Sequence, residues 1–379
     1  MIRWRNKADC GFGIPENKYA PQRRRERREL QDLDFAFLRI FCGDHFENLK
    51  SEIVPPLTTH HSPLTNHQVG KGGALLKQPG LIAQIQQSWR SYLLCTPTLV
   101  LFLVFMVYPV FYVVHLSFHQ WDGITQMKFI GWENYARLLR DPLWWKALGN
   151  TMIYVLSKVC IELSLALGMA VVLNGKLRGR KFYRSVFFLP AVTSAAVIGI
   201  VFSGILSPFD GTFNEILMKL KLIAGFRDWL GDPKTALYTV IGVAIWHSAG
   251  INMVFFLAGL QSIPEYLYDA AKVDGAGAWR QFVYVTLPML RPIALIIVML
   301  SVIGSFKVFD LVNVMTGGGP YYASEVVTDY MFKYGFAGKG LGAGVISQQG
   351  YAATIGIGLF AIIAVFTFLQ LRLVRDKEK

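Results

Sequence analysis

Six apolar runs of about 20 residues dominate the sequence from residue 91 onward. They cover residues 93–117, 151–173, 184–207, 236–260, 289–311 and 352–373. A helix of about 20 apolar residues crosses the ~30 Å hydrocarbon core of a bilayer. The runs are continuous rather than alternating in polarity, so helices are the expected spanning form. The sequence therefore predicts an all-α membrane protein with six transmembrane helices.

Composition supports this class. Hydrophobic residues make up 53% of the chain and charged residues only 17%, whereas soluble domains carry about a quarter. The net charge of +13 does not indicate nucleic-acid binding, because the bases are dispersed and excess Lys and Arg collect on the cytoplasmic side of membrane proteins. The four cysteines fit no metal-binding or disulfide pattern, so we expect no metal site.

Residues 1–90 differ from the rest. They contain the basic run 23-RRRERR-28 and the polar stretch 58–73, and no apolar core long enough for a signal peptide. We expect a largely disordered N-terminal extension over 1–90 and a six-helix membrane domain over 91–379.

The loops predict the orientation. The short loop 174–184 carries five bases and no acid, and four further bases follow residue 371, whereas loop 208–235 balances four bases with four acids. Short basic loops lie inside the cell. Both termini and the connection between spans four and five are therefore expected in the cytoplasm, and connections 118–150, 208–235 and 312–351 outside.

That cytoplasmic connection is a charged insert between two apolar runs, 262–292. Ser262 and Glu265 have the spacing of a capping box, and Pro264 suits a first helical turn. Gly275 suits the left-handed position after a helix. A second short helix is expected from Ala276 to Thr286, so that two short helices lie at the membrane surface.

The first short helix has features of a docking surface. Ala270 and Ala271 allow close approach, and Asp269 and Lys272 are neighbours able to hold a partner in register. An ordinary amphipathic interfacial helix explains the same pattern. On physical grounds alone both interpretations stay open.

The insert resembles the signature loop of bacterial ABC importer permeases. The matching residues are Asp269-Ala270-Ala271, Asp274-Gly275-Ala276, Phe282, Leu287-Pro288 and Pro292. The family's first Glu is Asp269 here, which keeps the charge on a shorter side chain. The resemblance runs from about 92 to 374, and segments 130–151, 185–197 and 305–320 are similar to the carbohydrate-uptake branch, with the maltose-type and glycerol-phosphate-type permeases.

The resemblance implies a multi-subunit importer in the inner membrane of a prokaryote. It implies a second permease, identical or different, two ATP-binding subunits, an extracytoplasmic solute-binding protein and a carbohydrate substrate. The insert would be the coupling helix lodged in the ATPase. Its expected coupling residues are Glu265, Asp269, Ala270, Ala271, Asp274, Gly275, Ala276, Leu287 and Pro288.

No enzymatic role or cofactor is expected for the chain itself. The phosphate-binding pattern G-x-x-x-x-G-K-[ST] does not occur, so ATP is expected on partner subunits. The glycine-rich segments 316–320 and 338–344 are interpreted as an outer turn and an outer loop.

Polar residues inside the spans are candidate functional residues, because charge at membrane depth is costly. Lys158 and Glu162 lie four apart on one helix face and are expected to pair. Such a pair either holds helices together or forms part of a proton or solute path, and both remain open.

Two further polar sets suit sugar binding, which needs hydrogen-bonding groups and an aromatic face. They are Trp246, His247, Ser248 and Asn252 in span four, and Phe306, Lys307, Asp310 and Asn313 in span five. Lys307 and Asp310 are three apart, which suggests a pair. Helix–helix packing explains the same residues.

The favoured function is thus the permease subunit of an ATP-driven carbohydrate importer. A proton-coupled secondary transporter, with Lys158 and Glu162 as its relay, is the first alternative, although it does not account for the insert. A non-transporting membrane scaffold is the second.

Overall fold

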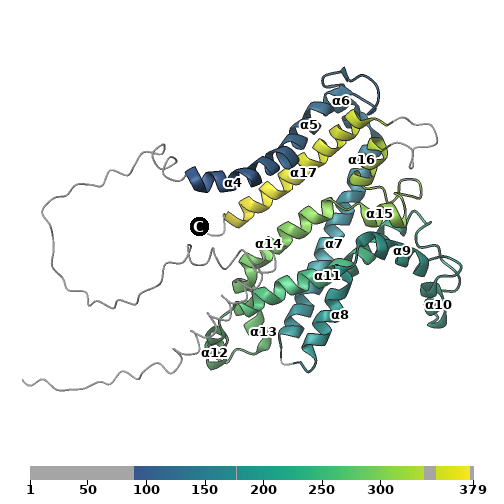
Figure 1. The fold of residues 1–379 in the computed structure, drawn as a ribbon. Coiled ribbons are helices and arrows are strands. Elements are labelled where there is room, and N and C mark those ends of the chain that lie inside the picture. Colours follow the sequence, from purple (N-terminus) through teal and green to yellow (C-terminus); the bar gives the residue numbers. More distant parts are fainter. Residues whose placement is uncertain (1–88, 176, 337–346, 376–379) are drawn as a thin grey trace, which may run out of the picture. The chain divides into compact units, whose positions relative to one another are not determined.

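The computed structural model describes residues 89–175, 177–336 and 347–375 (Figure 1). Residues 1–88 of the extension expected to be disordered lie outside these ranges, and so does the whole of segment 338–344. The helices in chain order are α4 (Trp89–Phe102), η2 (Leu103–Val107), α5 (Tyr108–Ser117), α6 (Glu133–Arg140), α7 (Pro142–Asn174), α8 (Arg180–Val192), α9 (Ala195–Ile205), α10 (Thr212–Lys219), α11 (Ala236–Gln261), α12 (Glu265–Val273), α13 (Ala278–Gln281), η3 (Phe282–Thr286), α14 (Leu287–Phe306), α15 (Asp310–Met315), α16 (Val327–Gly335) and α17 (Gln349–Arg375).

Five of these helical segments are long and apolar enough to cross a membrane, and the number is six if the bent pair α8–α9 counts as one span. The five are Cys95–Ser117, Pro142–Asn174, Ala236–Gln261, Ala278–Phe306 and Gln349–Arg372. In the described part of the chain, the strands are β1 (His119–Gln120) and β2 (Lys128–Phe129), which pair antiparallel. The all-α membrane fold is confirmed.

The third predicted span is not one straight helix. Helices α8 and α9 are bent by 96° at a short break. Thr193 and Ser194 at the break have extended backbone (ψ 144° and 135°), so the helical hydrogen bonds cannot continue through them. Pro190 lacks an N–H and weakens the last turn of α8 further.

The insert also differs from its prediction. Instead of a second separate helix from Ala276 to Thr286, the chain runs from Ala278 through α13 and η3 into span five without interruption. The π-helical stretch η3 ends two residues before Pro288, and η2 ends two residues before Pro109. A π turn widens the helix where proline supplies no N–H and crowds the preceding carbonyl, so the helix passes the proline intact.

The second span begins earlier than predicted, at Pro142. The Asp141 side chain caps it by accepting a hydrogen bond from the Leu143 N–H (2.9 Å). Burial alone would raise the pKa of Asp141, but hydrogen bonds from the Tyr330 and Tyr351 hydroxyls, with those from backbone N–H groups, outweigh it and lower that pKa. This first turn carries Trp144 into the core.

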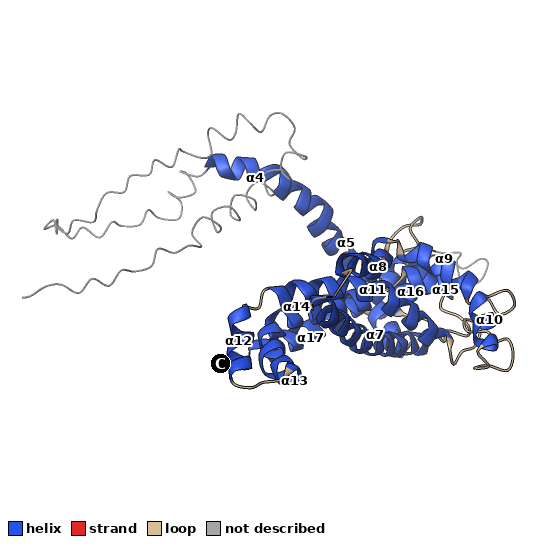
Figure 2. Cartoon of the chain, turned by 90° about the horizontal axis from the view of Figure 1, so that it is seen from below, coloured by secondary structure: helices blue, strands red, loops and turns tan. Residues whose placement is uncertain are grey.

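Helices α7 and α11 share the largest helix–helix contact, and α14 packs on both of them. Helix α5 packs on α17, and α15 packs on α9. Helices α12 and α13 lie at one end of the spans, and α10 and α15 lie at the other (Figures 1 and 2). The two ends of the spans therefore have different structures, and the cavity described in the next subsection lies between them.

Candidate functional site

The predicted pair in span two forms. Lys158 Nζ lies 2.5 Å from Glu162 Oε2, and both residues are buried, at 9% and 0% exposure. The other Glu162 oxygen accepts a hydrogen bond from Asn252 Nδ2 on α11. Lys158 also donates to Ser305 Oγ on α14 (3.3 Å). One charged network therefore ties together three helices that are distant in sequence.

This network forms part of the wall of a cavity of about 360 Å³, called here the polar cavity. Helices α7, α11, α14 and α15 line it, together with residue Ala195 of α9 and the 307–309 link. Its polar and charged lining residues are Tyr154, Lys158, Glu162, His247, Ser248, Asn252, Ser301, Ser305, Lys307 and Asp310. The formal charges of its two lysines and two acids cancel.

The polar cavity brings together five of the eight residues predicted for the solute pathway: His247, Ser248, Asn252, Lys307 and Asp310. His247 Nε2 lies 3.1 Å from the Thr193 carbonyl oxygen at the α8–α9 break, so this histidine already has a partner. Ser248 donates to the Ala244 carbonyl of its own helix (2.7 Å). Both lie in the wall with their hydrogen bonds already made.

Three predicted pathway residues lie elsewhere. Trp246 packs on Phe202, with ring centroids 5.2 Å apart, and lines a separate apolar pocket. Phe306 is fully buried against Phe366. Asn313 on α15 is absent from the cavity lining. Successive helical residues point about 100° apart, which separates Trp246 from its neighbour His247.

The suggested pair between Lys307 and Asp310 does not form among the described residues. Helix α14 ends at Phe306, and Lys307 is its C-cap, so the helical spacing that brings residues three apart together does not hold there. Both side chains are exposed at the cavity instead of neutralising each other.

The sequence did not identify three hydroxyl-bearing residues of this site: Tyr154, Ser301 and Ser305. Ser301 is 8% exposed, and its Oγ has no hydrogen-bond partner. Ser301 and Ser305 are four apart, on one face of the predicted fifth span, and that spacing was the available signal.

The insert lacks the expected capping box. Ser262 keeps helical backbone as the C-cap of α11, and its hydroxyl donates back to the Gly259 carbonyl (2.7 Å). Pro264 is therefore the N-cap of α12 rather than a first-turn residue. Ser262 therefore ends the preceding helix instead of starting the next one.

The other local predictions for the insert hold. Gly275 has φ +75°, and its N–H bonds to the Lys272 carbonyl while the Ala276 N–H bonds to the Ala271 carbonyl. These two bonds form a Schellman motif that ends α12. Lys272 Nζ lies 2.9 Å from Asp269 Oδ1.

One face of the insert is anchored to the spans and the other is open. Ile263 is buried, Leu267 and Tyr268 pack beside it, and the Tyr268 and Thr286 hydroxyls lie 3.1 Å apart. The predicted coupling residues Glu265, Asp269, Ala270, Asp274, Gly275, Leu287 and Pro288 are exposed, and Ala271 and Ala276 are half-buried.

Large apolar side chains on the insert are also exposed, and the sequence did not single them out. Tyr266, Val273, Trp279 and Tyr284 are between 69% and 88% exposed. Tyr266 and Val273 are seven apart and share a helix face, which was a readable signal. Exposed aromatic and aliphatic groups on a compact loop are typical of a protein-docking surface.

Comparisons with known proteins agree with this architecture. The model of the family described as binding-protein-dependent transport system inner membrane component matches residues 162–379. The probable ABC transporter permease protein YurN of Bacillus subtilis is 36% identical, over 74% of this chain and 94% of its own length. The lactose transport system permease protein LacF of Rhizobium radiobacter is 35% identical, over 76% of this chain and 95% of its own.

Among solved structures, a bacterial alginate ABC transporter, in complex with an alginate pentasaccharide-bound periplasmic protein, has a chain with the same fold. The TM-score is 0.68 at 22% identity, covering 79% of this chain and 98% of that one. Family model and relatives together show that the protein is a multi-pass inner membrane protein and not itself an enzyme. The chain belongs to the binding-protein-dependent transport system inner membrane component family, the permease subunits of ABC transporters.

Proposed function

We propose that this permease subunit imports a carbohydrate and that the polar cavity is part of the solute path. The cavity carries the proposal: it lies among the spans, offers hydroxyl, amide and charged groups, and has no net formal charge. Neutral polyhydroxylated solutes suit such a lining, because polar groups fix orientation without an ion to neutralise. The names of two relatives, a lactose and an arabinooligosaccharides transport system permease protein, support the same class.

The insert is the proposed attachment point of the ATP-binding subunits. Its anchored face makes it rigid with spans four and five, and its exposed face offers Tyr266, Val273 and Trp279 to a partner. A rigid helix held by a moving subunit transmits rigid-body motion to the spans on either side. The Asp269 carboxylate is already paired with Lys272, so a basic side chain of a partner would compete with Lys272 for this carboxylate.

The assembly follows from this role. The chain acts with an extracytoplasmic solute-binding protein, a second permease of the same or a different sequence, and two ATP-binding subunits. The five bases of loop 174–184 support a cytoplasmic position for the insert and for both termini.

The contacts of Lys158 and Glu162 argue against a proton relay. Both Glu162 oxygens accept hydrogen bonds, and Lys158 has two partners, so the pair is held as a structural tie. A stand-alone proton-driven carrier also leaves the exposed insert unexplained.

Uptake in membrane vesicles tests the proposal. Transport of the saccharide should require internal ATP and the partner subunits, and should survive an uncoupler.

Asp310→Ala should lower uptake or raise the solute concentration for half-maximal uptake, because Asp310 lines the cavity. Asn313→Ala, on the same helix but absent from the lining, is the matched control. ATP-independent uptake, or equal effects of the two substitutions, would contradict the proposal.

A further inference from the structure

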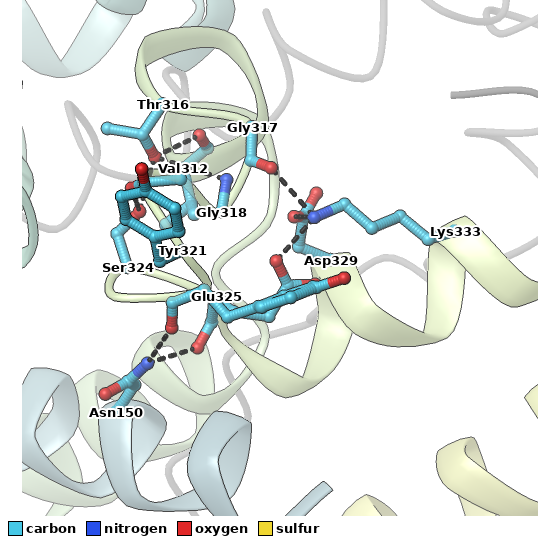
Figure 3. Close-up of polar contacts among 12 residues, drawn as sticks. Asn150, Val312, Thr316, Gly317, Gly318, Tyr321, Ser324, Glu325, Asp329 and Lys333 are labelled. Atoms are coloured by element: carbon cyan, nitrogen blue, oxygen red, sulfur yellow. Dashed lines mark hydrogen bonds and ion pairs between the residues drawn. The ribbon is translucent and has the colours of Figure 1, made fainter. Parts of the chain in front are cut away.

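Three charged side chains are buried together (Figure 3) in and just before α16, which lies at the end of the spans away from α12 and α13 (Figure 1). Glu325, Asp329 and Lys333 are 1%, 0% and 6% exposed. Lys333 Nζ donates to Glu325 Oε2 and lies 3.0 Å from Asp329 Oδ2. Two carboxylates thus face one ammonium group. If all three are ionised, one negative charge is buried without a counter-charge, which is costly.

Lys333 also holds a turn of the chain. Its Nζ donates to the Gly317 carbonyl (2.8 Å) in the turn 316–319. The neighbouring Gly318 has φ +81°, and a Cβ on it would lie 1.8 Å from Glu325 Oε2. The charged cluster therefore sits directly against the backbone of the turn, with no room for a side chain between them.

The turn is the direct continuation of α15. Thr316 is the C-cap of that helix, and the Gly317 N–H bonds to the Val312 carbonyl (2.9 Å). The first two residues of α15, Asp310 and Leu311, line the polar cavity. A contact that fixes the turn therefore also fixes the position of one cavity wall.

The cluster has too few donors for two ionised carboxylates. Glu325 Oε1 and Asp329 Oδ1 have no hydrogen-bond donor, and Asp329 Oδ2 has only its ion pair with Lys333 (3.0 Å). Burial raises the pKa of Glu325 to about 7, against the opposing effect of Lys333 and with help from the Asp329 charge. One proton on Glu325 leaves a neutral Asp329–Lys333 pair.

Other titratable groups on the surrounding elements are engaged elsewhere or neutral. These are Lys146 of α7, which donates to the Tyr321 carbonyl; Tyr322, whose ring centroid is 6.0 Å from Lys333 Nζ; and Tyr330 and Tyr351 of α16 and α17, which donate to Asp141. Asn150 of α7 contributes only neutral hydrogen bonds, to the Tyr322 and Glu325 carbonyls.

We propose that Glu325, Asp329 and Lys333 form a proton-dependent latch that holds the 316–319 turn, and with it the cavity wall provided by α15. Lys333 is a positioning residue, which acts through Gly317. The latch is tight with one proton bound and loosens when that proton is lost. The effect of the latch on solute transport rests on the proposed function, whereas the latch itself does not.

The direction of the pH dependence follows from the raised pKa. The pKa of Glu325 is about 7 with the turn closed, and we expect its ordinary value of 4.5 when the turn opens and water reaches the carboxyl group. The stabilisation is fully present below 4.5 and is lost as the pH rises through about 7. The opening equilibrium should therefore rise about tenfold between pH 6 and pH 8.

Cysteine labelling of the full chain in membranes tests the latch. Ser324 is buried beside the turn, so a Ser324→Cys side chain reacts with a maleimide only when the turn opens. Tyr321→Cys, at a position 85% exposed, corrects for the pH dependence of the thiol itself. Both are made in a background whose four native cysteines are replaced by alanine. We expect the labelling rate of Ser324→Cys divided by that of Tyr321→Cys to rise about tenfold from pH 6 to pH 8.

Two substitutions decide the mechanism. Glu325→Gln should make the ratio independent of pH, and Asp329→Asn should move the midpoint to lower pH, because the Asp329 charge helps to raise the pKa of Glu325. A flat ratio in the parent, or an unchanged slope in Glu325→Gln, overturns the proposal. If Glu325→Gln fails to insert, an unchanged midpoint in Asp329→Asn overturns it instead. Labelling needs neither solute nor ATP, so the result stands whether or not the proposed function is correct.

Discussion

At the scale of single residues, the sequence predicted pairings within one helix but not partners on other helices. The spacing of Lys158 and Glu162 was sufficient to predict their contact, because residues four apart share a helix face. The roles of Asn252 and Ser305 in the same network depend on how α11 and α14 pack on α7, which no local pattern records. The suggested Lys307–Asp310 pair was wrong because α14 ends just before Lys307 and Asp310 begins another helix.

Removing one member of the buried pair should be much worse than removing both. Lys158→Met leaves the Glu162 charge buried without its counter-charge and should cost about 3–5 kcal/mol of folding free energy. The double substitution Lys158→Met with Glu162→Gln should recover most of that loss and keep ATP-driven uptake. Thermal unfolding and uptake of the assembled transporter measure both. A double variant that folds yet transports nothing would favour the relay role instead.

The two glycines of the outer turn should respond differently to alanine. Gly317 and Gly318 both have positive φ, so each alanine carries a left-handed backbone cost of about 1–2 kcal/mol. A Cβ at position 318 also collides with Glu325, Lys333 and Asp329, whereas at position 317 the nearest atom is 3.9 Å away. Gly318→Ala should therefore lower the unfolding temperature distinctly more than Gly317→Ala, and equal losses would show that the cluster does not press on the turn.

At the scale of elements, apolar length predicted which segments are helices, and backbone chemistry decided where they start, bend and stop. The end of span four was predicted to within one residue, at 260 instead of 261. Span three was predicted as straight because hydropathy does not record the extended backbone at Thr193 and Ser194. The capping signal at Ser262 failed because Ser262 still has helical backbone as the C-cap of α11, and the following residue Ile263 is buried.

The end of α12 offers an element-scale prediction. Gly275→Pro should abolish transport, because proline fixes φ near −65° while this position has φ +75°, and because the bond from its N–H to the Lys272 carbonyl is lost. Gly277→Pro is the matched control, since φ there is already −68°. We expect it to retain most ATP-driven uptake. Both variants are compared at equal amounts in the membrane, and wild-type uptake by Gly275→Pro would refute the role of this turn.

At the scale of the whole molecule, the six apolar runs and the loop charges predicted the class of protein, and the signature residues of the insert predicted its family. The described structure adds what a linear pattern cannot contain: a cavity assembled from four helices and the 307–309 link, and the exposure of large apolar side chains on the insert. The cavity and the insert lie at different levels of the same spans, so we expect α11 and α14 to carry motion of the insert to the cavity.

The central claim is that the insert is a cytoplasmic lever held by an ATP-binding subunit. Val273→Cys, at a position 88% exposed, tests it most directly in the cysteine-free background. A membrane-impermeant maleimide should label this cysteine only from the cytoplasmic side, and bound ATP-binding subunits should protect it at least severalfold. Labelling from the outer side, or equal labelling with and without those subunits, would contradict the account.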